Sequence, residues 1–520
     1  MKQLLSCLLA VSLVVINVGA AFAQQYPQPG DGTTNAVVQN KNMSGQSATV
    51  VETYYRPDGT VAVTTSGTVI QSRAVREFKT AEVPGLPSGF QGSAVLGSNE
   101  GLAAVVSIQY RNVPGDILDP SRQTQAAYNA TSAPATTLYF PSVWRFNAIV
   151  SRISIQNTEN QPANITLTFK KRDGAAAGSL NATLPAYGQR TFYLGNASDV
   201  PPNFPADFRD GSVTVESTNG RLLAGASTAT WANRAGAYQG LTESNKGKVL
   251  YAPSHYRFIF NAPANWQNLP ATQWTLYSAL NLQNTSTTAT ANVKLTYTAR
   301  GATTPSLVKN ITIPPLSAAG LNTQNGGDFP ATDFYALSKA GNGLPDWDGS
   351  VLIESDQDLV GTNVTNWGSL GYADLYALAG PSEGSNLLFL PAQYRLHYTN
   401  TSGWSQWSAV NVQNIGDTTI SESNLFIDFV DVNGNVVKSF TGAELNPATK
   451  GDGLGPGEAI GLNTRNGGDL PASAFNSFPT VSGRPSFIGG VIVRAPAGSK
   501  LLAVGNIVYF NRASVYNGVP

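Results

Sequence analysis

Cysteine and histidine are almost absent from this chain of 520 residues, and their scarcity excludes much chemistry. Cys7 is the one cysteine, so a chain cleaved after Ala23 has no thiol for a disulfide, a thiolate nucleophile or a metal ligand. The two histidines, His255 and His397, come without an HExxH motif or a Gly-x-Ser-x-Gly turn. The sequence therefore argues against zinc hydrolysis and a Ser-His-Asp centre, and we expect no enzyme activity.

Charge is scarce as well. Charged residues make up 12% of the chain, about half the usual share of roughly 25%. Lys+Arg and Asp+Glu both number 32, and no basic run is present that would neutralise phosphates or anionic lipids. We therefore expect no nucleic-acid partner. Hydrophobic residues still account for 42% of the chain, which is enough to form buried cores.

Long apolar runs are missing after the N-terminus. Lys2 precedes an apolar run from Leu8 to Ala20, and Ala21-Phe22-Ala23 has the small-x-small pattern of a cleavage site. No later run reaches the roughly 20 residues that a membrane-spanning helix requires. The sequence predicts a signal peptide over residues 1–23, no membrane span after cleavage, and a secreted, extracellular protein associated with the cell surface.

The chain contains instead one sequence pattern that is repeated four times. A Gln-Asn pair ends an alternating strand at 39–40, 156–157, 283–284 and 413–414, with spacings of 117, 127 and 130 residues. Each copy continues through a polar bend, a second alternating strand, a Pro-to-Phe loop and a closing tyrosine. A period of this length is a whole domain. We predict units over 36–135, 136–245, 246–384 and 385–520, after a polar segment over 24–35.

The pattern within a unit is that of short strands. In the second unit, runs such as SRISIQN, ANITLTF and SVTVES alternate polar and apolar residues and are rich in Val, Ile and Thr. About seven such strands per unit predict an antiparallel β-sandwich in which one face of each sheet contacts water. We therefore predict an all-β protein with four tandem antiparallel β-sandwich (immunoglobulin-like) domains in an elongated rod.

Two kinds of residue mark the repeats. An asparagine at a strand end accepts local backbone hydrogen bonds and tolerates a left-handed turn, so we favour a structural role over ligand binding for Asn40, Asn157, Asn284 and Asn414. A linking element with the pattern Pro-x-x-aromatic-Arg-apolar lies between successive units and occurs three times for four units. Its arginine is expected to stack on the neighbouring aromatic ring or to cap a sheet edge. These arginines are Arg145, Arg257 and Arg395.

The whole phrase, as in ISIQNTENQPANITLTFKKRDG (153–174), resembles bacterial extracellular tandem immunoglobulin-like modules of the cell-adhesion-related kind. The resemblance rests on the order of apolar strand, Gln-Asn, polar bend, alternating strand and Asp-Gly. It covers nearly all of the mature chain. It implies non-catalytic domains in a secreted or cell-surface setting, and it carries over no binding residue.

Aromatic side chains in polar loops are the binding candidates. Trp266, Trp347 and Trp404 lie among Asn, Ser and Asp residues. As exposed rings they would stack on sugars or fill a partner's pocket. A place in the core is the alternative, which we favour for Trp274 and Trp407.

Acidic residues offer two further candidates. Asp346 and Asp348 flank Trp347 in a pattern that contacts sugars and is also a common turn. Asp428, Asp431 and Asn433 offer oxygens to calcium, although the full EF-hand pattern is missing. The sequence indicates no other cofactor or metal.

Two functions fit this sequence. The first is a secreted, non-catalytic structural or adhesive cell-surface protein, such as a component of a surface layer, matrix or fibre, or an adhesin. Its expected partner is the protein itself, in a homo-oligomer or filament. The second is a secreted polysaccharide-binding protein that uses exposed tryptophans, and its expected partner is a cell-surface polysaccharide.

The first unit lacks a linking element. QQYPQPGDGTTN (24–35) stands in its place and is too polar and too rich in Pro and Gly for a good strand. If the linking element supplies the first strand of each unit, the first unit has an open sheet edge, which is a template for another chain. We expect this segment, or the C-terminal VYNGVP, to bridge to a neighbouring copy head to tail and to build a filament.

Overall fold

The computed structural model describes residues 31–111, 124–146, 149–231, 234–339, 341–397, 404–509 and 512–520. The described chain is all-β, as predicted, with several sheets whose strands pair antiparallel. None of the helices that the structure describes is long and apolar enough to cross a membrane.

The helices are short and lie in loops. They are η1 (Thr80–Glu82), η2 (Ala197–Asp199), η3 (Glu243–Asn245), η4 (Trp266–Asn268), η5 (Ala271–Gln273), η6 (Ala331–Phe334), η7 (Gly368–Leu370), η8 (Pro381–Glu383), η9 (Glu422–Asn424), η10 (Gly442–Glu444), α2 (Asn446–Thr449) and η11 (Ala472–Phe475).

The strands fall into four sets that follow one another along the chain, here called repeats 1 to 4. Repeat 1 contains β1 (Asp31–Asn40), β2 (Ala48–Tyr55), β3 (Val61–Thr64), β4 (Thr68–Ile70), β5 (Val75–Lys79), β6 (Ser93–Ser98), β7 (Leu102–Arg111) and β8 (Thr124–Asn129). Repeat 2 contains β9 (Thr137–Phe146), β10 (Ile149–Asn157), β11 (Ala163–Lys171), β12 (Ala176–Leu184), β13 (Gln189–Tyr193), β14 (Asp210–Ser217), β15 (Leu223–Trp231) and β16 (Arg234–Gln239).

Repeats 3 and 4 follow a similar plan, except that β23 spans the places of both β14 and β15 and that the short strands β22, β30 and β31 are added. Repeat 3 contains β17 (Gly247–Phe258), β18 (Leu276–Asn284), β19 (Ala291–Ala299), β20 (Pro305–Ile313), β21 (Ala318–Asn322), β22 (Gly326–Gly327), β23 (Asp346–Trp367) and β24 (Tyr372–Ala377). Repeat 4 contains β25 (Leu387–Leu396), β26 (Gln406–Asn414), β27 (Phe426–Asp431), β28 (Val436–Phe440), β29 (Ala459–Asn463), β30 (Gly467–Gly468), β31 (Thr480–Val481), β32 (Arg484–Arg494), β33 (Leu501–Tyr509) and β34 (Arg512–Asn517).

Strand β1 corrects one expectation. Residues 31–35, which the sequence indicated to be too polar for a strand, begin β1 and pair with β7, from Asp31 opposite Arg111 to Asn35 opposite Ser107. The long partner strand and the β-branched Thr33 and Thr34 stabilise this extended backbone. Residues 24–30 of the same predicted segment lie outside the described residues.

Repeat 2 shows the layering clearly. Strands β12, β11, β14 and β9 form one sheet, and β13, β10, β15 and β16 form another. Strand β9 leaves the first sheet to contact β10. Alternating side chains of both sheets, such as Ile155, Leu167 and Val215, are buried together in one core. Burial of such side chains contributes roughly 1.5–3 kcal/mol each.

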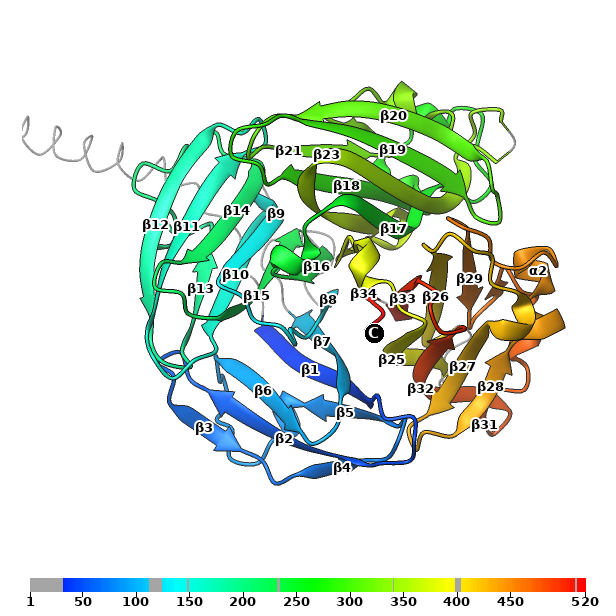
Figure 1. Cartoon of the computed structure of the whole chain (residues 1–520), viewed down its shortest axis with the longest axis horizontal. Coiled ribbons are helices and arrows are strands. Elements are labelled where there is room, and N and C mark those ends of the chain that lie inside the picture. Colours follow the sequence, from blue (N-terminus) through cyan, green and yellow to red (C-terminus); the bar gives the residue numbers. More distant parts are fainter. Residues whose placement is uncertain are drawn as a thin grey trace, which may run out of the picture.

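The four repeats lie around a common centre instead of end to end, as Figure 1 shows. Strand β34 of the last repeat packs against β8 of the first, and β25 packs against β1. Ala103 of repeat 1 shares a buried cluster with Phe389 and Ile492 of repeat 4. The chain therefore closes into a ring, and the prediction of an elongated rod is wrong.

The reason is that each glycine turn docks on the flank of the next repeat. The backbone N–H of Ala318 in repeat 3 donates to the carbonyl of Arg172 in repeat 2 at 3.0 Å. Gly174 of that turn has a φ of 85°, and a Cβ there would lie 2.9 Å from the Cβ of Ser317. Glycine meets both demands, a left-handed backbone and a close approach. This contact turns the chain at every repeat.

The ring closes with the same kind of turn. Gly434 of repeat 4 has a φ of 86°, and a Cβ there would lie 2.2 Å from the carbonyl oxygen of Ser72 in repeat 1. The C-terminal residues also join this closure, because Val519 pairs with Phe389 and the Lys41 ammonium donates to the carbonyl of Pro520. VYNGVP is thus engaged within its own chain, and the prediction that it bridges to another copy is wrong.

A closed ring has a measurable shape. We expect small-angle X-ray scattering of residues 24–520 to give a radius of gyration slightly above the roughly 23 Å of a compact chain of about 500 residues. The distance distribution should be symmetric. A much larger radius with a long tail in that distribution would contradict the ring.

Candidate functional site

Four closing strands, one from each repeat, meet at the centre of the ring. They are β8, β16, β24 and β34, and each forms the edge of the sheet to which it belongs. The labels of β8, β16 and β34 lie near the centre of the ring in Figure 1. An edge strand carries backbone N–H and C=O groups that its own sheet does not pair. Four such edges in one buried place need a shared acceptor.

Asp374 of β24 is that acceptor. Its Oδ1 accepts hydrogen bonds from the backbone N–H groups of Ala237 and Leu375, both at 2.8 Å. Its Oδ2 accepts from the N–H groups of Ala127 and Val515, both at 2.9 Å. Each of the four closing strands therefore donates one hydrogen bond to a single carboxylate.

This carboxylate is fully buried. Burial raises the pKa of Asp374 well above its usual value, and the four N–H donors act in the opposite direction. A carboxylate has about four acceptor positions, and all of them are occupied here. Asp374 therefore holds strands together, and its oxygens have no acceptor position left for a substrate.

Amide side chains form a second layer beside this junction. The backbone N–H of Asn517 donates to Oδ1 of Asn129 at 2.9 Å, and Nδ2 of Asn129 donates to the carbonyl of Asn517 at 2.7 Å. Nδ2 of Asn517 also donates to the carbonyl of Ala377 at 3.0 Å. These bonds join repeats 1, 3 and 4.

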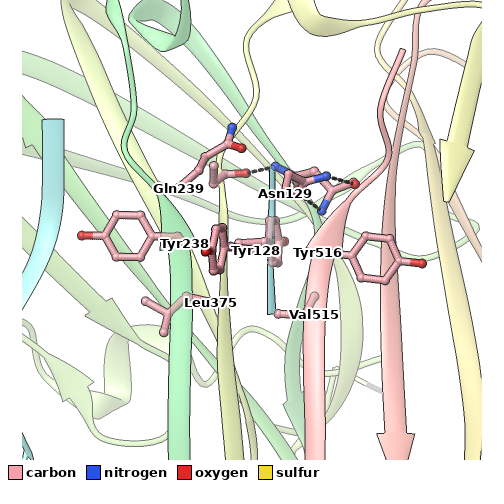
Figure 2. Close-up of a pocket in the computed structure, with 10 residues that line it drawn as sticks. Tyr128, Asn129, Tyr238, Gln239, Leu375, Val515 and Tyr516 are labelled. Carbon is pink, nitrogen blue, oxygen red and sulfur yellow. Dashed lines mark hydrogen bonds between the residues drawn. The ribbon is translucent and has the colours of Figure 1, made fainter. Parts of the chain in front are cut away.

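A small cavity lies against this second layer, as Figure 2 shows. It contains about 190 Å³ of empty space, part of which opens to solvent. Asn129 and Tyr128 lie beside it, whereas the rings of Tyr238 and Tyr516 point away from it in opposite directions. The cavity has amide groups on its wall but no phenol hydroxyl from these two tyrosines.

The closing tyrosines hydrogen-bond the backbone of the linking elements. The hydroxyl of Tyr376 donates to the carbonyl of Ser254 at 2.7 Å and accepts from the N–H of Ser254 at 3.2 Å. Tyr238 bonds Ser142 in the same way. Each of these serines follows the proline of a linking element, where the strand register shifts. The closing tyrosine therefore satisfies the backbone that the bulge leaves unpaired.

The three linking-element arginines stack on aromatic rings, but not on the rings beside them in the sequence. The distance from the guanidinium carbon to the ring centroid is 4.6 Å for Arg257 over Trp266, 5.1 Å for Arg145 over Phe204 and 5.1 Å for Arg395 over Trp404. Burial lowers the pKa of Arg257 to about 10. Its Nη1 also donates to the carbonyl of Leu337 at 2.9 Å. These residues hold loops onto the sheet.

The tryptophans correct the sequence interpretation. Trp266 is 5% exposed and Trp347 is 0% exposed, so neither is the exposed ring that was predicted. Nε1 of Trp347 donates to Oγ of Ser306 at 3.0 Å. Trp266 packs edge-on against Trp274 and Tyr335 beneath Arg257. Its Asn-rich neighbours in the sequence concealed these distant partners.

Trp404 and Trp407 are less buried than Trp266 and Trp347. Trp404 is half-buried under Arg395, and its ring centroid lies 6.1 Å from that of His397. Trp407 is half-buried with Arg465 over its ring. Trp274 is buried, as predicted.

Asp348 belongs to an ion cluster between repeats and not to a sugar-binding loop. Its Oδ2 lies 3.0 Å from Nε of Arg300, whose Nη1 lies 3.7 Å from Oδ2 of Asp469 in repeat 4. Burial opposes ionisation, yet the charges of Arg300 and Lys339 hold the pKa of Asp348 below its usual value. Repeats 2 and 3 meet through an equivalent cluster of Arg172, Asp210 and Asp328.

The acids proposed for calcium are engaged as well. Asp428 is nearly buried and lies 2.7 Å from Nε of Arg494. Oδ1 of Asp431 accepts from the N–H groups of Asn433 and Asn435 within a turn. Among the described residues, no group of three or more His, Cys, Asp or Glu side chains lies together to hold a metal ion.

The four repeat asparagines make local backbone bonds, as predicted. Nδ2 of Asn284 donates to the carbonyls of Ala289 at 2.8 Å and Ile313 at 2.9 Å, and its Oδ1 accepts from the N–H of Ser286 at 3.0 Å. Asn40, Asn157 and Asn414 bond their own loops in the same way. None of the four has a positive φ, so the expected left-handed turn does not occur at these residues.

His255 is buried among aromatic rings. Its Nδ1 lies 2.7 Å from Oδ1 of Asn363, and the rings of Tyr297 and Trp347 pack beside it. Burial lowers the pKa of His255 to about 4. The side chain is therefore a neutral packing element at pH 7.

Replacement of Asp374 by asparagine tests the junction. An amide nitrogen in place of one oxygen leaves two buried N–H donors without an acceptor, at about 1–3 kcal/mol each. We expect urea denaturation to show that Asp374→Asn lowers the free energy of unfolding by roughly 2–6 kcal/mol. Glu216→Gln, at an exposed acid on β14, is the control and should change it by less than about 0.5 kcal/mol. Wild-type stability of Asp374→Asn would contradict the junction.

The pH dependence of stability tests His255. The unfolded imidazole has a pKa near 6.5, so between about 6.5 and 4 the unfolded chain binds a proton that the folded chain does not. The free energy of unfolding should fall as the pH decreases through this range, and His255→Phe should remove roughly 3 kcal/mol of that fall. Urea denaturation at pH 7, 5.5 and 4.5 measures the difference. His397→Gln should retain the loss that His255 causes, and equal curves for wild type and His255→Phe would refute the assignment.

Neither the protein-family models nor the curated proteins contain a match to this chain. The resemblance to bacterial immunoglobulin-like modules therefore remains a prediction.

Proposed function

We propose that this chain is exported and works as a non-catalytic structural or adhesive component of the cell surface, built from four immunoglobulin-like β-sandwich repeats. The observation that carries the proposal is the junction at Asp374. The most deeply buried acid of the described chain accepts four backbone hydrogen bonds and joins four repeats. The hydrogen-bonding capacity of this carboxylate is used to hold the four repeats together.

The other reactive side chains support the same proposal. His255 is neutral and packed in a core, Arg257 holds a loop, and Arg300 joins two repeats through Asp348 and Asp469. Each of these groups stabilises the ring. A protein that must keep its form outside the cell without disulfides benefits from such internal links.

The closed ring also suits a surface role. Every repeat is fixed by two neighbours, so the local opening of one repeat costs the contacts of both. The neutral, hydroxyl-rich composition gives a surface that does not attract nucleic acid. Polysaccharide binding through Trp266 and Trp347 is not part of the proposal, because both rings are buried.

Export is the first test of this function. When the full-length gene is expressed in a bacterial host, we expect the chain in the envelope or medium fraction, with a mass that corresponds to cleavage after Ala23. Detection should use an antibody, because a C-terminal tag would disturb the contact between Pro520 and Lys41. Ala23→Asp should block cleavage and retain the precursor. A full-length chain found only in the cytoplasm would refute the proposal.

A further inference from the structure

Strand β6 of repeat 1 has a partner on only one side within the part of the chain that the structure describes. Among the described residues it pairs with β2 alone, from Tyr55 opposite Ser93 to Val50 opposite Ser98. The strands at the same place in the other repeats are β14, β23 and β32, and each has partners on both sides. β14, for example, lies between β11 and β9.

The core-facing side chains of β6 are also less buried than those of the corresponding strands. The core-facing residues Val213 and Val215 of β14 are 0% exposed, as are Val491 and Val493 of β32. Their counterparts in β6 are Ala94, which is exposed, and Leu96, which is only partly buried. The core of repeat 1 is correspondingly small. Over the described ranges, repeat 1 thus has no strand on the second side of β6.

The other repeats show what fills this place. In repeat 2 it is β9, which runs antiparallel to β14 with Phe140 opposite Val213 and Leu138 opposite Val215. Leu138 and Phe140 are fully buried, and Tyr139 between them faces the other way. Strands β17 and β25 do the same with Leu250 and Ala252, and with Leu388 and Leu390.

The corresponding segment of this chain falls at the predicted cleavage site. Phe140 precedes Gln156 by 16 residues, and the residue 16 positions before Gln39 is Ala23. By the same count, residues 20–23 hold the sequence positions of 137–140, and they belong to the predicted signal peptide. Residues 24–30, which lie outside the described residues, hold the sequence positions of 141–147 and have no Leu, Ile, Val or Phe. Cleavage after Ala23 therefore removes the residues that correspond to Leu138 and Phe140.

Glu52 adds a second peculiarity to the same place. It faces the core of repeat 1 at the position where repeats 2, 3 and 4 have Leu167, Leu295 and Ile427. It is 6% exposed, and its Oε1 accepts from the hydroxyl of Tyr54 at 2.7 Å. A carboxylate has further acceptor positions, so a strand laid along β6 gains a bond if it carries a hydrogen-bond donor here.

We propose that cleavage after Ala23 leaves β6 as the acceptor of an extended segment of another protein. That segment pairs antiparallel with β6, buries apolar side chains at alternate positions over Ala94 and Leu96, and offers a hydrogen-bond donor to Glu52. The inference rests on the proposed export, since cleavage uncovers the edge. It makes β6 the attachment point of the ring.

A second copy of this chain is the less suitable donor. Its strands β9, β17 and β25 are paired within their own repeats. Its C-terminal residues are engaged at the ring centre and against Phe389. Within the described ranges, every strand that matches the required pattern is already in use. A different protein with an extended apolar-alternating segment is therefore the expected partner.

The probe is a labelled peptide with the sequence of residues 135–142, ATTLYFPS, which contains the donor pattern of β9. We expect it to bind residues 24–520 saturably by fluorescence anisotropy. A matched peptide with Leu138→Asn and Phe140→Asn keeps the length and backbone but loses the apolar side chains. It should bind at least tenfold more weakly.

Disulfide trapping tests the register. The chain 24–520 has no cysteine, so Val95→Cys is unique in it. The register of β9 on β14 places peptide residue 139 opposite position 95. A peptide with Tyr139→Cys should form a disulfide with Val95→Cys, whereas a peptide with Leu138→Cys should not, because its thiol faces the other side of the sheet.

A variant that carries its own copy of the donor strand provides the opposite test. Residues 136–147 joined directly to Asp31 give repeat 1 its own copy of β9. This variant should unfold at a higher temperature than residues 24–520 and should no longer bind the peptide. The same graft with Leu138→Asn and Phe140→Asn is the control, and it should unfold like residues 24–520 and bind the peptide.

Three results would overturn the proposal. The first is the absence of peptide binding together with an ineffective graft. The second is a concentration-dependent dimer that the graft abolishes, which would make a second copy the donor. The third is an intramolecular disulfide between Tyr26→Cys and Val95→Cys, which would show the chain covering its own edge. Export is judged separately: an unexported precursor whose 24–520 fragment binds the peptide defeats the proposed function and leaves the acceptor edge standing.

Discussion

The fold depends on one carboxylate that receives four backbone N–H groups. Asp374 is the point at which β8, β16, β24 and β34 meet, and no cation lies among its hydrogen-bond partners. The closing strands leave their outer backbone groups unpaired within their own sheets, so the junction converts four sheet edges into one buried contact. The glycine turns determine how neighbouring repeats pack against each other, and the junction at Asp374 brings all four repeats to a common centre.

Local interactions could be predicted from the sequence, and long-range ones could not. The bonds of Asn284 span a few residues and one neighbouring strand, so its place at a strand end was sufficient evidence. The bond from Ala127 to Asp374 spans 247 residues, and nothing in a period of repeats distinguishes a ring from a rod. The acid in YADLYA was a visible signal, because an otherwise apolar closing strand contains it, but only the ring gives it a purpose.

The tryptophans show why polar surroundings mislead. Trp266 lies in an Asn- and Gln-rich loop, and its ring is nevertheless buried by Arg257, Trp274 and Tyr335. An arginine whose charge is delocalised stacks on an aromatic face while its N–H groups bond loop carbonyls. A polar loop is thereby attached to an apolar sheet. Exposure therefore depended on the distant arginine and not on the adjacent residues.

The shared junction also limits how alike the repeats can be. The residue two places before the closing tyrosine is Ala126, Gly236, Asp374 and Ser514 in turn. One acid suffices for four donors. Four acids at one buried point would repel each other, and a junction without any acid would leave the four N–H donors unsatisfied. A ring made from identical copies of any one repeat therefore has either too much charge at its axis or too little. Each repeat therefore has a fixed position in the ring, and the order of the repeats along the chain is itself part of the structure.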